Sequence, residues 1–295
     1  MDAFDNSTGI DAGEALRRYA PEVSEVLRRM IFSSTGSLDA LVRSTCAETL
    51  SLPALPLPPI THSAPESVAR EFAEQFSVDV SNVDGDLRAA LFKELGSQAK
   101  EFVFSVYVAD WFPRLLHALD LLFGPWTSEA KLTAEWRETE LSVDSAEFSR
   151  SVARLRVLDP VTTELVRLRQ ARQHNCRLCK SLRMSSALEA GADEALFDEV
   201  DNYQDSALSA RHKAALSLAD AMVWQPGYIP ADVIDAVREH FSPAESVELV
   251  LDMTRNASSK VAVAFGSDAP HVDEGVEIYE VDEDGQVTFG LGFRV

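Results

Sequence analysis

Two cysteines three residues apart form the clearest chemical pattern in the sequence. They lie in ELVRLRQARQHNCRLCKSLR, residues 164–183, where Cys176 and Cys179 make a CxxC pair. Two thiols one helical turn apart can close a disulfide within one chain with little backbone movement. Three cysteines in 295 residues are too few for a disulfide scaffold. The spacing therefore favours thiol redox chemistry, and Cys46, alone in an apolar helical pattern, is interpreted as a small buried residue.

The residues around the pair supply charges that could tune a thiol. The thiolate is the nucleophile, and a nearby cation stabilises it. In a very acidic protein, four basic residues flank the cysteines: His174, Arg177, Lys180 and Arg183. If the segment is one helix, Cys176, Cys179 and Arg183 share a face. Glu164, twelve residues before Cys176, could accept or relay a proton.

The same stretch resembles the alkylhydroperoxidase D and carboxymuconolactone decarboxylase family. The family pattern is a glutamate, eleven intervening residues, CxxC, and a histidine four residues later; Glu164, Cys176 and Cys179 match it in type and spacing. The resemblance covers roughly residues 155–270. It implies that Cys179 is the peroxide-reacting thiol, Cys176 the resolving thiol and Glu164 the start of a proton relay. A dithiol electron donor would then reduce the disulfide.

The sequence departs from the family pattern at two positions. Leu178 and Arg183 stand where family peroxidases carry histidines. Arginine keeps its charge at any working pH, so Arg183 cannot shuttle protons, although it can lower a thiol pKa. His174 could take over part of the relay. We expect thiol chemistry with an altered relay, acting on a peroxide or disulfide substrate.

Three other functions fit parts of the pattern. A carboxymuconolactone-decarboxylase-type lyase is supported by the same fold but does not need two cysteines. A noncatalytic redox-sensing assembly module would use the dithiol without turnover. A structural zinc half-site lacks a second CxxC or an HxxxH. The leading hypothesis is an antioxidant peroxidase or disulfide oxidoreductase that needs no metal and no bound organic cofactor.

Caps and periodicity place these residues in an all-α fold. Asp159 and Pro160 open one helix, and Ser242, Pro243 and Glu245 open another that is expected to run to Gly266. Pro113 is expected to kink or break a long apolar helix. Residues 1–130 are predicted to form a degenerate helical half, 127–150 a polar joint, 151–270 the half with CxxC, and 274–295 a β-hairpin.

A weak internal echo supports two tandem halves. Asp110 precedes Arg114 by four residues, as Asn256 precedes Lys260, and each pair stands before a glycine. The family resemblance implies a homo-oligomer. The net charge of −21 argues against nucleic acid or an anionic membrane surface as partner. Because the sequence has no leader-like start and no apolar run long enough to span a bilayer, we expect a cytoplasmic protein.

Overall fold

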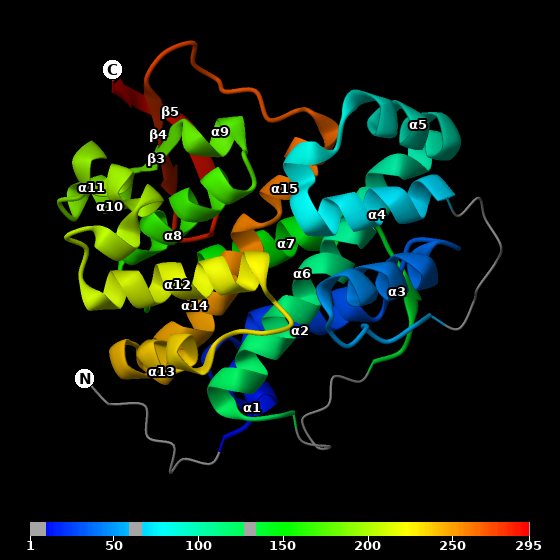
Figure 1. Cartoon of the computed structure of the whole chain (residues 1–295), viewed down its shortest axis with the longest axis horizontal. Coiled ribbons are helices and arrows are strands. Elements are labelled where there is room, and N and C mark those ends of the chain that lie inside the picture. Colours follow the sequence, from blue (N-terminus) through cyan, green and yellow to red (C-terminus); the bar gives the residue numbers. More distant parts are fainter. Residues whose placement is uncertain (1–9, 59–66, 127–133, 295) are drawn as a thin grey trace.

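The computed structural model describes residues 10–58, 67–126 and 134–294. The fold is mostly helical, with a small sheet near the carboxyl terminus (Figure 1). The helices are α1 (Ala12–Tyr19), α2 (Pro21–Ile31), α3 (Asp39–Leu50), α4 (Ser67–Asp79), α5 (Gly85–Leu95), α6 (Ala99–Phe123), α7 (Leu141–Ala153), α8 (Pro160–Gln173), α9 (Arg177–Lys180), α10 (Ser185–Glu189), α11 (Glu194–Asp198), α12 (Ala210–Trp224), α13 (Ala231–His240), α14 (Pro243–Asn256) and α15 (Ser259–Phe265). The strands are β1 (Ser33–Ser34), β2 (Arg137–Glu138), β3 (Leu182–Met184), β4 (Val276–Val281) and β5 (Val287–Arg294).

The two predicted helix starts are confirmed by their caps. The side chain of Asp159 accepts a hydrogen bond from the backbone N–H of Thr162 at 2.8 Å, and α8 begins there. Ser242 and Glu245 form the reciprocal capping box that opens α14. The single helix expected to run to Gly266 is wrong, because the chain breaks it after Asn256 and starts α15 at Ser259.

The long apolar helix α6 lies between helices from the first and the second part of the chain. It contacts α3 from the first part of the chain and α14 from the second (Figure 1). Pro113 lies inside α6, which runs unbroken for 25 residues, so a break at the proline is wrong. Buried side chains before and after the proline, such as Trp111 and Leu115, pack into the core. That packing offsets the backbone hydrogen bond that proline cannot donate.

The carboxyl-terminal hairpin is confirmed and joins the helical body. β4 and β5 are antiparallel, and β4 also pairs in parallel with β3, directly after α9, so the order is β3-β4-β5. Gly285, in the connecting turn, has φ 75°, and a Cβ built there would lie 2.3 Å from the carbonyl oxygen of Arg150. Glycine is thus required for the turn to lie against α7. The pairing with β3 brings the hairpin beside the CxxC segment.

The segment predicted to be a polar joint, residues 127–150, is helical from Leu141 onward. Its second part is the helix α7, which packs against α2 and α14. Leu141, Phe148 and Val152 are spaced along one face of the helix, and all three are buried. Three polar residues of the helix are buried as well, namely Asp144, Ser145 and Ser151. Residues 127–133 of the predicted joint lie outside the described residues.

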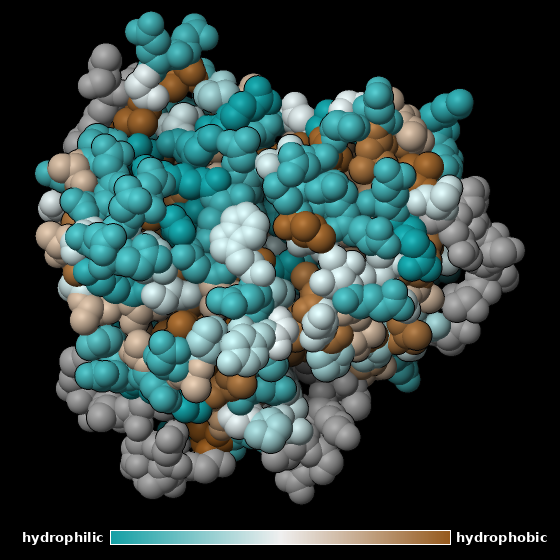
Figure 2. All heavy atoms as spheres, in the orientation of Figure 1, coloured by the Kyte–Doolittle hydropathy of each residue, from teal (hydrophilic) through white to brown (hydrophobic). Residues whose placement is uncertain are grey.

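The face of the molecule shown in Figure 2 is largely hydrophilic. Polar and charged side chains cover most of the face in Figure 2, and apolar side chains appear there as small separate areas. Within the three described ranges, none of the helices has both the length and the apolar character needed to cross a membrane.

Candidate functional site

The two cysteines are joined by a disulfide at the start of α9. Their Cα atoms lie 5.3 Å apart. Asn175, just before the pair, has φ 51°, a left-handed conformation that asparagine tolerates better than most residues. This residue ends α8 and turns the chain so that Cys176 becomes the N-cap of α9, with the Cys179 N–H directed at its sulfur at 3.2 Å.

The two cysteines differ in how far they are exposed to solvent. Cys176 is 1% exposed and belongs to the core, whereas Cys179 is only partly buried. An incoming molecule therefore meets Cys179 first, and Cys176 stands behind it. Cys46 is fully buried and has no disulfide, as the sequence predicted. Burial raises the pKa of its thiol to about 12, so Cys46 stays protonated and unreactive at neutral pH.

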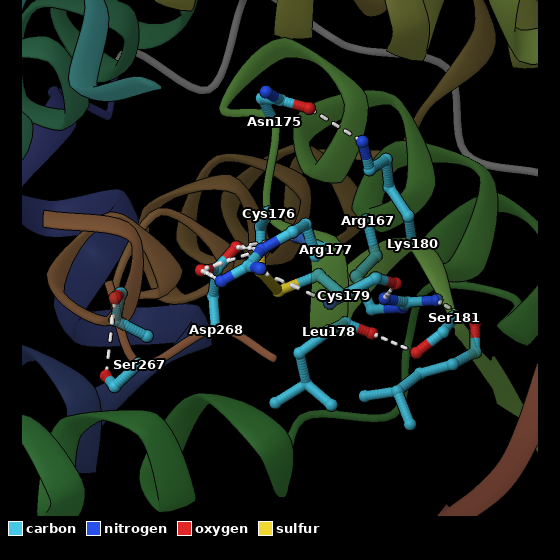
Figure 3. Close-up of a disulfide and its surroundings, with 12 residues drawn as sticks. Arg167, Asn175, Cys176, Arg177, Leu178, Cys179, Lys180, Ser181, Ser267 and Asp268 are labelled. Carbon is cyan, nitrogen blue, oxygen red and sulfur yellow. Dashed lines mark hydrogen bonds and ion pairs between the residues drawn. A yellow bond between two sulfur atoms is a disulfide. The ribbon is translucent and has the colours of Figure 1, made fainter. Parts of the chain in front are cut away.

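The cations next to the pair are bound to other groups. Arg177 forms an ion pair with Asp268 at 2.7 Å, and its backbone N–H also bonds that carboxylate (Figure 3). Lys180 donates to the side-chain oxygen of Asn175 at 2.7 Å. Burial alone would raise the pKa of Asp268, but its bonds from Arg177 hold that pKa below the ordinary value. These contacts fix the CxxC turn against the segment that follows α15.

Glu164, on α8, is fully buried. Arg167 binds both of its carboxylate oxygens, at 2.6 and 2.7 Å, and the backbone N–H of Met184 donates to it at 3.1 Å. Tyr279, in β4, donates its hydroxyl to the same carboxylate at 3.3 Å. The hairpin therefore supplies one wall of the site.

Arg167 connects Glu164 to the cysteine turn. Its guanidinium also donates to the backbone carbonyl oxygens of Cys179 and Leu182, both at 2.7 Å. Burial opposes its charge, but the Glu164 carboxylate outweighs burial and raises the pKa of Arg167. Sequence reasoning missed this residue, although its position three residues after Glu164 on one helix was a usable signal. It missed Tyr279 too, for which no local signal exists.

Arg183 does not share a helix face with the sulfurs, and that expectation is wrong. α9 ends at Lys180, and Arg183 lies in β3, where it is 5% exposed. Its guanidinium forms a two-point ion pair with Glu194 and lies over the ring of Phe197. The charge of Arg183 is thus compensated by a carboxylate on α11.

We expect Arg183→Met to leave the pH profile of Cys179 alkylation unchanged. The substitution removes the hydrogen bonds by which the Arg183 guanidinium connects Lys180 at the end of α9 to Glu194 in α11. The free energy of unfolding should therefore fall by about 1–3 kcal/mol. Iodoacetamide rates between pH 6 and 9 and urea unfolding measure the two effects. A profile displaced to higher pH by about one unit would instead assign the thiolate-stabilising role to Arg183.

His174 is turned away from the cysteine turn and into the core. It is 4% exposed, and its ring lies edge-on to that of Trp111 at 5.8 Å. Burial, with further contributions from Lys260 and Arg114, lowers its pKa well below the ordinary value, so the ring is neutral. Among the described residues, neither ring nitrogen has a hydrogen-bond partner. The expected role of His174 as a cation beside the sulfurs is wrong.

Next to His174, three of the four residues of the internal echo, Asp110, Arg114 and Lys260, meet in a buried ionic cluster. Asp110 pairs with Arg114 at 2.6 Å and with Lys260 at 2.5 Å, and all three side chains are at most 4% exposed. Arg114 also donates to the backbone carbonyl oxygens of Met222, Val223 and Ser77. The cluster ties α6 to α12 and α15. In the described part of the chain, no group of three or more histidine, cysteine or acidic side chains is placed to hold a metal ion.

The chain is similar to two proteins from different strains of Mycobacterium tuberculosis. "Uncharacterized protein MT2376" and "Uncharacterized protein Rv2313c" are each 46% identical to it over 281 residues, covering 91% of this chain and 98% of the relative. No family model matches the sequence, and no solved structure matches it. Neither relative's name states an activity.

Proposed function

We propose that this chain, which belongs to the same family as the two mycobacterial proteins, is a thiol-dependent oxidoreductase acting through Cys176 and Cys179. The observation that carries the proposal is the unequal burial of two bonded cysteines, Cys179 partly exposed and Cys176 in the core. That arrangement suits an attacking thiol and a resolving thiol. The buried Glu164–Arg167 pair holds the backbone of the attacking residue.

The proposed reaction reduces a hydroperoxide in two steps. The Cys179 thiolate attacks the distal peroxide oxygen, the O–O bond breaks, and the departing alkoxide takes a proton to become an alcohol. The resulting sulfenic acid condenses with the Cys176 thiol, which forms the disulfide and releases water. A dithiol donor then reduces the disulfide by exchange and is itself oxidised. With a disulfide as substrate, only the exchange steps operate.

The proposed fold relation is to the alkylhydroperoxidase D-like proteins, with the amino-terminal half as a degenerate copy. The meeting of Asp110 with Lys260, one from each half, supports a paired arrangement. A homo-oligomeric assembly and a cytoplasmic location stay predictions. A lyase of the carboxymuconolactone decarboxylase type is the rival function, and it would leave both thiols unchanged during turnover.

We expect mild peroxide or diamide to form the Cys176–Cys179 disulfide in the reduced native protein. Alkylation with iodoacetamide after unfolding should label three thiols in the reduced protein. In the oxidised protein it should label only Cys46, because Cys176 and Cys179 are then bonded to each other. Peptide mapping by mass spectrometry identifies the bond.

The matched control is Cys46→Ser, which should behave like the parent in the native state. Cys176→Ser should instead stop at a Cys179 sulfenic acid, which dimedone traps. If both cysteines of the pair stay alkylatable after oxidant, the redox function is wrong. If the bond forms but neither a hydroperoxide nor a small disulfide is turned over with dithiothreitol as donor, the pair is a redox sensor rather than an enzyme centre.

A further inference from the structure

A cavity of about 240 Å³ lies beside the site, between α14 and the start of α8. Neither cysteine lines it, and Glu164 does not line it either. One part of its wall is apolar and includes Leu155, Met184 and Val281. Another part carries acidic and basic side chains. The volume suits a molecule slightly smaller than the usual ligands of protein pockets.

Asp252 is a buried acid of this wall that has no close hydrogen-bond partner among the residues described. It is 4% exposed, yet its nearest contacts are the hydroxyl of Thr163 at 3.4 Å and the guanidinium of Arg255 at 3.9 Å. A carboxylate can accept about four hydrogen bonds, and a buried one is normally paired closely. Arg255 makes no closer polar contact with any described residue. An anion and a cation thus line one cavity without satisfying each other.

Glu248 lies one turn earlier on α14 and lines the same cavity. A single oxygen of this carboxylate accepts both recorded bonds, from the backbone N–H groups of Val157 and Leu158 at 2.7 and 3.1 Å. Among the described residues, its other oxygen has no recorded hydrogen bond. Two acids one turn apart therefore present acceptor capacity to the cavity.

The pKa values of the two acids agree with this geometry. Burial, and then the charge of Asp252, raise the pKa of Glu248 to about 7. Burial raises the pKa of Asp252 to about 6, against the opposing effects of Arg255, Thr163 and Arg156. Together with Ser186 of α10, these five residues are the charged and hydroxyl groups that line the cavity, from α14, from α8 and from the segment before α8. A bound ammonium group would stabilise the ionised acids and lower both pKa values.

We propose that this cavity binds a free α-amino acid with an apolar side chain. The ammonium group is placed by Asp252 and Glu248, and the carboxylate by Arg255. The side chain lies on the apolar wall. Two acids and two arginines, Arg156 being the second, leave the lining close to neutral, which matches a zwitterion and disfavours a dication or a dianion.

Calorimetric titration of the full chain with L-leucine, L-methionine and L-phenylalanine tests this proposal. We expect saturable binding of at least one of them, with one site per chain. The matched analogues of phenylalanine are 3-phenylpropanoate, which lacks the ammonium group, and phenethylamine, which lacks the carboxylate. Each should bind at least about tenfold more weakly than the amino acid, a difference of about 1.4 kcal/mol. Equal binding of either analogue, or no saturable binding of any amino acid at millimolar concentration, overturns the proposal.

Proton release gives a second readout. Repeating the titration near pH 6.5 in buffers of different ionisation enthalpy should show protons released on binding, since the ammonium keeps the acids ionised. Asp252→Asn should weaken binding by at least about tenfold. The control Asp235→Asn removes an exposed acid of α13 that does not line the cavity, and this variant should bind the amino acid like the parent. Unchanged affinity in Asp252→Asn would contradict the assignment even if the parent binds.

Discussion

Replacing Asp110 by alanine is expected to lower the free energy of unfolding by about 3–5 kcal/mol. The carboxylate is fully buried between Arg114 and Lys260, at 2.6 and 2.5 Å. Its removal leaves two buried cations without the anion that compensates them. The remaining bonds of Arg114 to backbone carbonyls satisfy its N–H groups but not its charge. Urea unfolding of parent and variant measures the loss.

The matched control is Glu22→Ala. This change breaks an ion pair of similar length, 2.7 Å, that Glu22 forms with Arg154 at the surface. The Glu22 side chain is 72% exposed, so solvent screens the pair and the change should be under about 1 kcal/mol. An equally small change for Asp110→Ala would mean that water reaches the cluster. The buried ion pairs would then contribute little to the free energy that holds α6 against α12 and α15.

Asp252→Asn, in contrast to Asp110→Ala, is expected to raise the free energy of unfolding. The pKa of Asp252 is about 6 when folded and near 3.8 when unfolded, because burial disfavours its charge. Between these values the folded chain binds more protons, so its free energy of unfolding falls as the pH rises. The full loss, of the order of 3 kcal/mol, is present above pH 6. Asparagine cannot ionise and should recover it.

Urea unfolding at pH 4 and pH 8 separates this effect from a simple packing change. The gain in Asp252→Asn should be largest at pH 8 and should approach zero near pH 4. Glu248→Gln is the informative comparison, because the pKa of Glu248 is raised to about 7 even though the backbone N–H groups of Val157 and Leu158 favour its charged form, so its gain at pH 8 should be of similar size. An Asn variant less stable than the parent at pH 8 would show that Arg255 holds Asp252 as a firm ion pair.

The parts of the fold that depend on neighbours in the sequence were predictable. Ser242 with Glu245, and Asp159 with Pro160, set their helix starts through contacts within four residues. The hairpin followed from alternation around a turn. The break between α14 and α15 and the continuity of α6 through Pro113 depend on packing against distant helices, which local pattern does not encode.

The site was predictable only in part, for the same reason. The CxxC pair and Glu164 were found from type and spacing. The end of α9 at Lys180 was not, because Leu182–Met184 leave the helix to pair with a strand almost a hundred residues later. His174 ends α8 and is buried near Trp111, a contact with a helix more than sixty residues away that local pattern does not indicate.

The parallel pairing of β3 with β4 sets an order of events during synthesis. Tyr279 follows Cys179 by 100 residues, so the thiols leave the ribosome well before the hydroxyl that contacts Glu164 exists in the chain. At a synthesis rate of about 5–20 residues per second, that interval lasts about 5–20 s. Throughout it the nascent chain carries its cysteines without their sheet. The segment is therefore open to oxidants and to reductants before the protein can control which one it meets.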